Sequence, residues 1–382
     1  MRVFLIAGEP SGDALGAALM AGLRQLVPDV RFDGVGGPAM QGAGLTSRFP
    51  MEELSVMGIA EVLPKYRALK RRIAQMADLI CATSPDVVVT IDSPDFCLRV
   101  AKMVKATRPD IRIVHYVAPS VWAWRPKRAD KMAARVDQVL ALLPFEPPYM
   151  EAAGVACDFV GHPVATMQVA TEGEIAAFRS RYSLGDGPVL LVLPGSRRGE
   201  VQRLTERFGA ALAEFCARHP QMRVVLPCAA PVAGLVRQLT AEWPVKPVLI
   251  DPAEDRDGAM KRAAFAVADL ALAASGTVSL ELAANDVPMV IAYDMSPVSR
   301  AIISRMVKID TVTLVNLVSD TRGVPEFIGK ACTPEKIAAG LEAVWCAPEA
   351  QKDAMRLTMD RLGRGGEAPG LRAARALLAG LK

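Results

Sequence analysis

Residues 193–201, LPGSRRGEV, place a glycine turn and two arginines where an apolar strand should end and a helix begin. Backbone N–H groups at a helix start favour an anion, and an arginine adds charge-assisted bonds that can be bidentate. A diphosphate suits this chemistry. We predict that Gly195, Ser196 and Arg197 bind one, the alternative being a surface turn with solvated arginines.

A second loop, AASGTVSLELAA at 273–284, repeats the arrangement. Ser275, Gly276 and Thr277 offer N–H and O–H donors to phosphate, and Glu281 in the following helix can accept both hydroxyls of a ribose. Alone, Glu281 is most simply an ordinary helix-surface residue. Together with the first loop it predicts a site for a nucleotide diphosphate.

The stretch VVVTIDSPDF, 87–96, carries Asp92 to the carboxyl end of a buried strand, where α/β proteins have their crevices. A carboxylate there can take the proton from an attacking hydroxyl. Helix capping is the alternative, and we assign it to Asp95.

Aromatic and basic residues follow another strand in HYVAPSVWAWRPKR, 115–128. Aromatic faces beside cations suit a sugar ring or a phosphorylated ligand. Trp122 and Trp124 could instead pack a domain corner, and His115 is better explained as a structural residue than as a metal ligand.

The segment 51–76 combines an apolar patch with a basic one, a pattern typical of an interfacial helix on an anionic membrane. A core-facing helix with a solvated basic face is the alternative. The patch consists of Val56, Met57, Ile59, Val62, Leu63, Lys65, Arg67, Lys70, Arg71 and Arg72.

Short β-branched runs alternate with amphipathic segments, which predicts an α/β protein with parallel sheets. Residues 166–188 interrupt the alternation and the run from 189 restarts it. We therefore expect an N-terminal domain over 1–165, a second over 186–345 and a C-terminal helical segment over 346–382. Two doubly wound domains facing across a cleft would bring the strand ends of both to one crevice.

Composition excludes several classes. The 45 basic and 41 acidic side chains among 382 residues give a net charge of +4, which does not favour a nucleic-acid partner. Seven cysteines without a CxxC pair indicate a reducing cytosol and no structural zinc. Asp-Arg-Asp at 255–257 has no second ligand cluster, so we interpret it as surface and expect no metal or other cofactor. The sequence contains no run of 18 uncharged apolar residues, so we expect no membrane span. Glu9 interrupts the N-terminal apolar run before it reaches the length of an export signal.

Read in order, these stretches resemble the lipid-A-disaccharide synthase family of inverting glycosyltransferases. The motifs AGEPSGDALGA, MEELSVMGIAEVL, IDSPDF, HYVAPSVWAWRPKR, LPFE, GHP, LPGSR, ASGTVSLE and PMVIAY cover the chain from residue 7 to about 330. The resemblance implies a GT-B fold of two Rossmann-like domains without a required catalytic metal. A C-terminal helix in such proteins commonly crosses back to the first domain.

The resemblance also implies the reaction. UDP-2,3-diacylglucosamine would donate its sugar to the 6-hydroxyl of 2,3-diacylglucosamine 1-phosphate, giving a β-1,6 disaccharide and UDP. Both substrates are acylated, so we expect a peripheral enzyme on the cytosolic face of the inner membrane. The resemblance suggests a homodimer, although no residue pattern in this sequence indicates one.

By motif, Asp92 would be the general base, and both glycine-turn loops would bind UDP together with Asn316 and Glu326. The acceptor side would include His115, Trp122 and the turn of residues 7–19, where Ser11, Gly12 and Asp13 would line the acceptor pocket. The chain departs from the family in having Cys97 after PDF, and Val315 before Asn316 where the family has proline. The first departure puts a hydrogen-bonding role at position 97 in doubt, and the second could alter the backbone near the nucleotide.

Three rivals remain open at this point. A UDP-sugar 2-epimerase-like enzyme would share the frame and the nucleotide loops but need no acceptor. A dinucleotide oxidoreductase is disfavoured because neither glycine turn has the G-x-G-x-x-G spacing. A non-catalytic membrane scaffold would be indifferent to Asp92 and Arg197.

Overall fold

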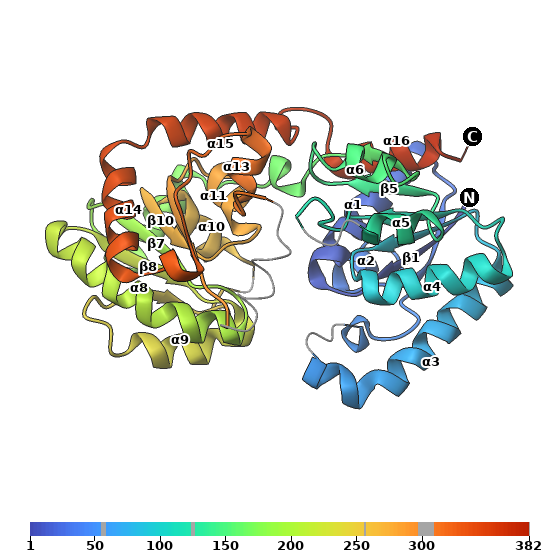
Figure 1. Cartoon of the computed structure of the whole chain (residues 1–382), viewed down its shortest axis with the longest axis horizontal. Coiled ribbons are helices and arrows are strands. Elements are labelled where there is room, and N and C mark those ends of the chain that lie inside the picture. The colour runs from blue at the N-terminus through green and yellow to red at the C-terminus, as the bar shows by residue number, and fades with distance from the viewer. Residues whose placement is uncertain (55–58, 124–126, 256, 297–308, 382) are drawn as a thin grey trace. The chain divides into compact units, whose positions relative to one another are not determined.

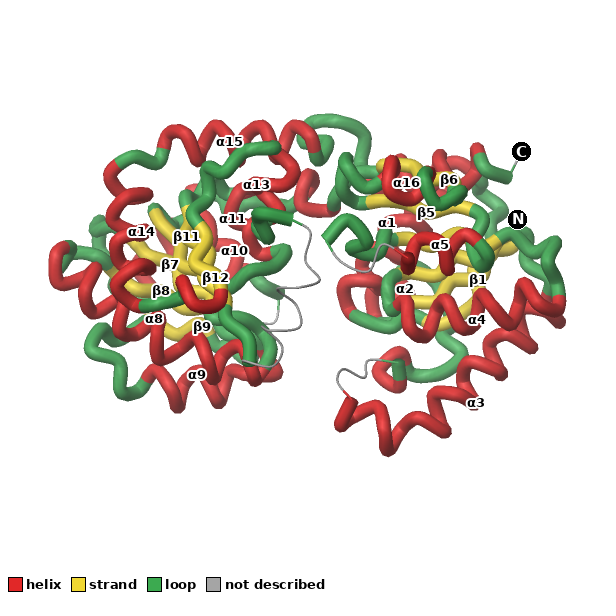
Figure 2. Tube along the Cα trace, in the orientation of Figure 1, coloured by secondary structure: helices red, strands yellow, loops and turns green. Residues whose placement is uncertain are grey.

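The computed structural model describes residues 1–54, 59–123, 127–255, 257–296 and 309–381, without the side chains of 59–66. The chain forms two compact units, one of Met1–Thr166 with Gly365–Lys382 and the other of Met167–Arg364. In each, helices pack on both faces of a parallel sheet (Figures 1 and 2). The fold class is therefore α/β, with two Rossmann-like units.

The sheet of the first unit has the order β2-β1-β3-β4-β5-β6, and neighbouring strands pair in parallel. Its central strands are apolar on both faces because helices cover both sides. The strands are β1 (Arg2–Ala7), β2 (Arg31–Val35), β3 (Val87–Ile91), β4 (Ile113–Tyr116), β5 (Gln138–Ala141) and β6 (Ala156–Phe159).

The helices that directly follow β1, β2 and β3 each begin with a proline, whose missing N–H costs nothing in the first turn. The helices of this unit are α1 (Pro10–Leu26), α2 (Pro38–Gly42), α3 (Ile59–Thr83), α4 (Pro94–Thr107), α5 (Lys127–Ala133), α6 (Pro147–Glu151) and α16 (Pro369–Ala379).

The second unit has the sheet order β12-β11-β10-β7-β8-β9, again parallel. Its strands are β7 (Val189–Leu193), β8 (Arg223–Pro227), β9 (Val248–Ile250), β10 (Leu270–Ala273), β11 (Met289–Tyr293) and β12 (Glu326–Ile328). Its helices are α7 (Glu172–Arg181), α8 (Arg198–Arg218), α9 (Ala233–Thr240), α10 (Ala259–Ala266), α11 (Val278–Ala284), α13 (Leu314–Ser319), α14 (Pro334–Cys346) and α15 (Glu349–Arg361).

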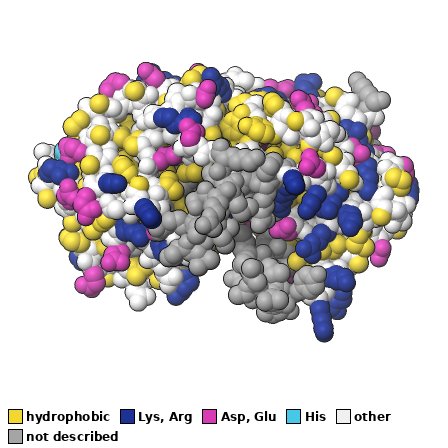
Figure 3. All heavy atoms as spheres, viewed as in Figure 1, with side chains coloured by type: hydrophobic (Ala, Val, Ile, Leu, Met, Phe, Trp, Pro, Cys, Tyr) yellow, Lys and Arg dark blue, Asp and Glu magenta, His cyan; other side chains and the backbone are white. Residues whose placement is uncertain are grey.

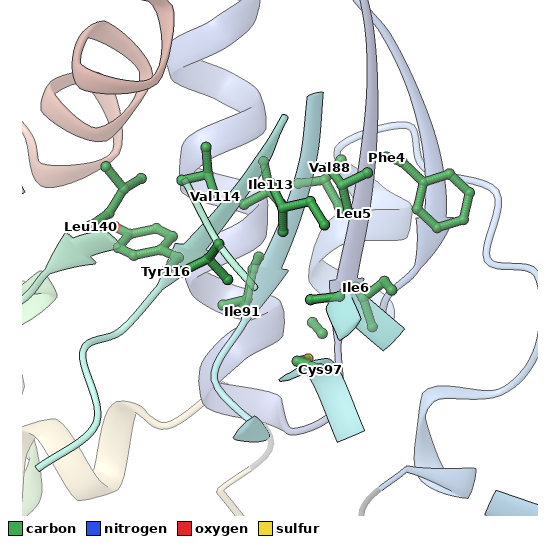
Figure 4. Packing of buried hydrophobic residues seen from close by; sticks show 14 of the residues in the cluster. Phe4, Leu5, Ile6, Val88, Ile91, Cys97, Ile113, Val114, Tyr116 and Leu140 are labelled. Carbon is green, nitrogen blue, oxygen red and sulfur yellow. The ribbon is translucent and has the colours of Figure 1, made fainter. Parts of the chain in front are cut away.

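The core of the first unit surrounds β1, β3 and β4 (Figure 4). Cys97, in the first turn of α4, is fully buried within it, and burial raises the pKa of its thiol. The departure from the family at this position is thus an apolar packing residue.

The C-terminal segment divides between the units, and its last residues belong to the first. Helix α15 packs on α11 and α13 in the second unit, whereas α16 packs on α1 in the first. Gly22 and Gly370 allow that contact, because a Cβ on Gly22 would lie 2.6 Å from the carbonyl oxygen of Gly370. The guanidinium of Arg372 also donates to the carbonyl of Phe159.

Candidate active site

The two predicted nucleotide loops leave adjacent strands of the second unit. Leu193 of β7 pairs with Ala273 of β10, and the N–H of Ala274 donates to the carbonyl of Leu193 at 2.8 Å. The chain continues from β7 to β8 and β9 on one side and from β10 to β11 and β12 on the other. The loops therefore meet at the topological switch point, where open α/β sheets bind ligands.

A pocket of about 570 Å³ lies at this point. All seven residues predicted on these two loops line it, namely Gly195, Ser196, Arg197, Ser275, Gly276, Thr277 and Glu281. Its wall is extended by Pro227 and Cys228 at the end of β8 and by Ile250 and Pro252 at the end of β9. The volume and the mixture of apolar walls with polar donors suit a nucleotide-sized ligand.

Glu200, which the sequence analysis missed, organises the first loop. Its carboxylate accepts from the backbone N–H groups of Ser196 and Arg197, each at 3.3 Å, and from the Arg197 guanidinium at 3.0 Å. Gly195 has φ of +108°, and a Cβ there would lie 2.6 Å from Glu200 Oε2. Glu200 is the third residue of helix α8, where a glutamate often bonds back to the start of the helix, and this position is the signal that could have identified it.

The second loop presents its donors more openly. Within the described residues, no protein acceptor takes the N–H of Ser275, Gly276 or Thr277. Glu281 forms an ion pair with Lys261, Nζ to Oε2 at 2.7 Å. Lys261 also lines the pocket and was not predicted.

Asp255 lies at the pocket too, which corrects its interpretation as plain surface. Its carboxylate accepts from the N–H groups of Met260 and Lys261, each at 2.8 Å, and so caps helix α10.

Asn316 and Glu326 are not among the residues that line this pocket. Asn316 is 1% exposed and bonds to the backbone of Val324 at both ends of its amide. Glu326 accepts from the N–H of Thr313 at 2.6 Å and the hydroxyl of Thr311 at 2.7 Å. Both side chains are thus engaged within the fold, and their binding to UDP stays a prediction.

In the first unit, Asp92 follows β3 at the corresponding switch point, beside the end of β1. Ala7 pairs with Ile91, so Gly8 and Asp92 emerge side by side. Asp92 and Ser93 have φ of +50° and +41°, a left-handed conformation that costs free energy in non-glycine residues. Such outliers are common at functional sites.

Burial raises the pKa of the Asp92 carboxyl above its usual range, against a smaller lowering by the N–H of Ser93. A raised pKa makes a carboxylate a stronger base, which is the property that proton abstraction from a hydroxyl needs. Asp95 is exposed and pairs with Arg128 at 3.3 Å.

The turn at 7–19 makes hydrogen bonds and close packing contacts within the first unit. Asp13 is 3% exposed and accepts from the N–H groups of Gly37, Ala39 and Met40, which caps α2. The carboxylate therefore has a structural role, and a role on the acceptor side stays a prediction.

Close approach explains the glycines of this turn. A Cβ on Gly8 would lie 2.6 Å from Ser93 Oγ, and one on Gly12 would lie 3.5 Å from Ile91. Of the three acceptor-side residues predicted in this turn, Ser11 is exposed, whereas Gly12 and Asp13 are buried.

His115 is buried in the sheet and bonds through Nδ1 to Thr90 Oγ1 at 2.8 Å. Burial, together with the nearby Arg128, lowers its pKa to about 4. The sequence-based interpretation of His115 as structural agrees with this burial, and its role on the acceptor side stays a prediction.

Trp122 is half-buried and donates from Nε1 to Glu146 Oε1 at 3.3 Å, with its ring edge-on to Phe145. Glu146, in the LPFE motif, also accepts from the N–H of Leu143 at 3.0 Å. Burial raises the pKa of Glu146 to about 7 in spite of these bonds. Trp124 lies outside the described residues.

Only part of the predicted membrane patch can be followed. Val56 and Met57 lie outside the described residues, as do the side chains of Ile59, Val62, Leu63 and Lys65. Arg67, Lys70 and Arg71 are exposed on α3. Arg72 instead binds Glu53 through two nitrogens, at 2.8 and 2.9 Å, and covers the Phe49 ring, so its charge is neutralised within the fold.

Two Rossmann-like parallel sheets, the second with a nucleotide-sized pocket at its switch point, define an enzyme of GT-B fold. The chain resembles the solved UDP-GlcNAc 2-epimerase of Neisseria meningitidis bound to UDP-GlcNAc, with a TM-score of 0.68 at 12% identity over 100% of this chain and 99% of that one. At this identity the likeness concerns the fold alone.

The family model described as lipid-A-disaccharide synthetase matches residues 3–365. The lipid-A-disaccharide synthase of Ruegeria pomeroyi is 68% identical over 99% of this chain and 95% of its own, and that of Rhodospirillum centenum is 46% identical over 99% and 94%. The chain belongs to the lipid-A-disaccharide synthase family. It is a glycosyltransferase of lipid A biosynthesis. Its similarity to UDP-sugar 2-epimerases is a similarity of fold only.

Proposed function

We propose that the enzyme transfers 2,3-diacylglucosamine from UDP-2,3-diacylglucosamine to the 6-hydroxyl of 2,3-diacylglucosamine 1-phosphate. The products are the β-1,6 disaccharide 1-phosphate and UDP. One observation carries the donor side, namely that the loops 193–201 and 273–284 line a single pocket at the switch point of the second unit.

The diphosphate binds between the two loops in this proposal. Arg197 supplies a side chain that is 64% exposed, and Ser275–Thr277 supply backbone donors. Charge that builds on the departing UDP is stabilised by these preoriented donors. Glu281 accepts hydrogen bonds from the ribose hydroxyls.

Asp92 acts as the general base on the acceptor 6-hydroxyl. Its left-handed backbone, its position at the switch point and its raised pKa support this role. Positioned proton removal accelerates such reactions by about 10² to 10⁴. Backside attack at the anomeric carbon then converts an α-linked donor into a β-linked product.

The acceptor is bound by the first unit in this proposal, where exposed Ser11 and half-buried Trp122 are the most accessible of the predicted contact residues. Substitution of Ser11 by alanine is expected to raise the KM for the acceptor and to leave UDP binding unchanged. Weaker UDP binding with normal acceptor saturation would assign Ser11 to the donor instead.

The membrane association is part of the same proposal, since both substrates carry acyl chains. None of the helices in the described part of the chain is long and apolar enough to cross a bilayer. The enzyme would adhere peripherally to the cytosolic face of the inner membrane through segment 51–76. Lys and Arg side chains gather on the face of the first unit in Figure 3, as such binding requires. We also propose a homodimer, on the resemblance alone.

The decisive test measures disaccharide and UDP formation from both substrates in detergent with EDTA, for the wild type, Asp92→Asn and Asp95→Asn. Asparagine tolerates the left-handed backbone, so Asp92→Asn removes the base and keeps the turn. We expect product from the wild type and the exposed Asp95→Asn control, and a loss of at least about 10²-fold in Asp92→Asn.

Equal rates in all three proteins would remove Asp92 as base. Turnover of the UDP-sugar without acceptor would indicate an epimerase-like reaction instead.

A further inference from the structure

Helix α10 brings a lysine to the proposed nucleotide pocket. Lys261 lies in the first turn of this helix and lines the pocket together with Glu281 of α11. Its Nζ is 2.7 Å from Glu281 Oε2, and the side chains of Lys261 and Glu281 are 50% and 30% exposed. The ion pair therefore joins two helices at the open face of the pocket.

Both ends of Lys261 are held. Its backbone N–H donates to Asp255 Oδ2 at 2.8 Å, which ties the first turn of α10 to the pocket wall. Its Nζ lies 5.3 Å from the ring centroid of Phe265, a pocket residue that is 2% exposed. The ammonium group thus contacts both the Phe265 ring and the Glu281 carboxylate.

This arrangement restricts the glutamate. A glutamate side chain has several rotamers, and ordering them on ligand binding costs free energy. An ion pair formed before binding removes part of that cost. It leaves the acceptor sites available, because each carboxylate oxygen carries two lone pairs and Oε2 can accept from both Lys261 and a hydroxyl.

We propose that Lys261 is a positioning residue for the nucleoside, holding the Glu281 carboxylate where it accepts the ribose hydroxyls. The inference rests on the proposed function, in which UDP occupies this pocket. It assigns to Lys261 an effect on the ribose, not on the phosphates.

The test measures coupling between Lys261 and the ribose 2′-hydroxyl. UDP and 2′-deoxy-UDP are titrated calorimetrically into the wild type, Lys261→Met, Lys261→Arg and Lys336→Met, the last an exposed lysine on α14 outside the pocket. We expect the wild type to bind 2′-deoxy-UDP about tenfold more weakly than UDP, as loss of a hydrogen bond to a charged group predicts.

In Lys261→Met the ratio of the Kd for 2′-deoxy-UDP to the Kd for UDP is expected to fall below about threefold. UDP itself should bind about threefold to tenfold more weakly than to the wild type. Lys261→Arg and Lys336→Met should keep the wild-type ratio, and thermal melting should confirm that each variant is folded. In turnover, Lys261→Met should raise the KM for the donor and leave kcat within about twofold.

Three results would overturn the proposal. An unchanged ratio in Lys261→Met would uncouple the lysine from the ribose, and a larger ratio would show that it competes with the hydroxyl. A parallel titration of UMP completes the test, since an affinity loss in Lys261→Met that is greater for UDP than for UMP would make Lys261 a phosphate ligand. Failure of the wild type to bind UDP would instead overturn the proposed function.

Discussion

At the scale of single residues, burial decides which carboxyl groups can do chemistry. Asp92 and Glu146 both have pKa values raised by burial, but their partners differ. Glu146 is bonded by Leu143 and Trp122, whereas the N–H of Ser93 is the hydrogen bond that lowers the pKa of Asp92. The first therefore holds a loop, and the second retains capacity for a substrate hydroxyl.

The raised pKa of Asp92 predicts the acid limb of the pH–rate profile. A base must be ionised, so kcat/KM should rise with pH and level off above a pKa that lies higher than the usual range of aspartate. Measurement of kcat/KM from pH 4 to 8 should show this limb in the wild type and in Asp95→Asn. Its persistence in the residual activity of Asp92→Asn would assign the limb to another group.

Glu146 predicts a pH-dependent stability. Its pKa is about 7 in the fold against an ordinary value of 4.5, so the folded protein binds more protons between these values. Stability from this group is present below pH 4.5 and is lost as the pH rises to 7, by up to about 3 kcal/mol.

Urea unfolding of the wild type and Glu146→Gln at pH 5 and pH 8 tests this. The wild type should lose unfolding free energy relative to Glu146→Gln between pH 5 and pH 8, because glutamine does not titrate. The same difference at both pH values would show that the Glu146 carboxyl titrates alike in the folded and unfolded chain.

At the scale of elements, two turns at the switch point of the first sheet depend on each other. The turn from β1 into α1 contains Gly8, and the turn from β3 into α4 contains Asp92 and Ser93. Ser93 Oγ would lie only 2.6 Å from a Cβ on Gly8. The glycine therefore lets both turns share one edge of the sheet.

Gly8→Ala should displace the Asp92–Ser93 turn and lower kcat about tenfold or more, with a stability loss of about 1–3 kcal/mol from overpacking. Gly173→Ala is the matched control, because a Cβ there meets nothing within 4 Å and alanine favours its helix α7. Assays of kcat and urea unfolding compare the two. Normal kcat in Gly8→Ala would show that the turns adjust independently.

The exposed basic residues of α3 give another prediction at this scale. Arg67, Lys70 and Arg71 have helical spacing, so reversing their charges should weaken binding to vesicles with anionic lipid by about 1 kcal/mol per residue. Co-sedimentation with anionic and with purely zwitterionic vesicles measures the effect. Equal binding by the triple glutamate variant would move the membrane contact away from α3.

At the scale of the whole molecule, each unit has its own sheet, core and switch point. The described residues that line the nucleotide pocket all belong to the second unit. Binding of UDP should therefore stabilise that unit locally, by about 2.7 kcal/mol at a hundredfold excess over Kd.

Hydrogen exchange with and without UDP tests this. Peptides that cover 195–200 and 275–281 should gain protection, while peptides that cover β1 and β3 should not. Protection confined to the first unit would place the nucleotide there and contradict the proposed function.

The sequence alone determined what repeats locally. Alternation of apolar runs with amphipathic segments predicted two α/β units, and strand-turn-helix stretches predicted the loops that meet in the pocket. These signals are readable because hydrophobic period and turn chemistry act over a few residues. The motifs in order also predicted the family, which the comparisons confirmed.

Only the tertiary structure decided which polar side chains are already engaged. Asp13, His115, Asn316 and Glu326 looked available in the sequence but bond within the fold, while Glu200 and Lys261 were overlooked and line the pocket. Their partners are mostly far away in the sequence, as Asp13 from Gly37 or Lys261 from Glu281. A motif specifies residue types, but hydrogen-bond partners depend on which strands and helices pack together, and that is settled by the whole chain.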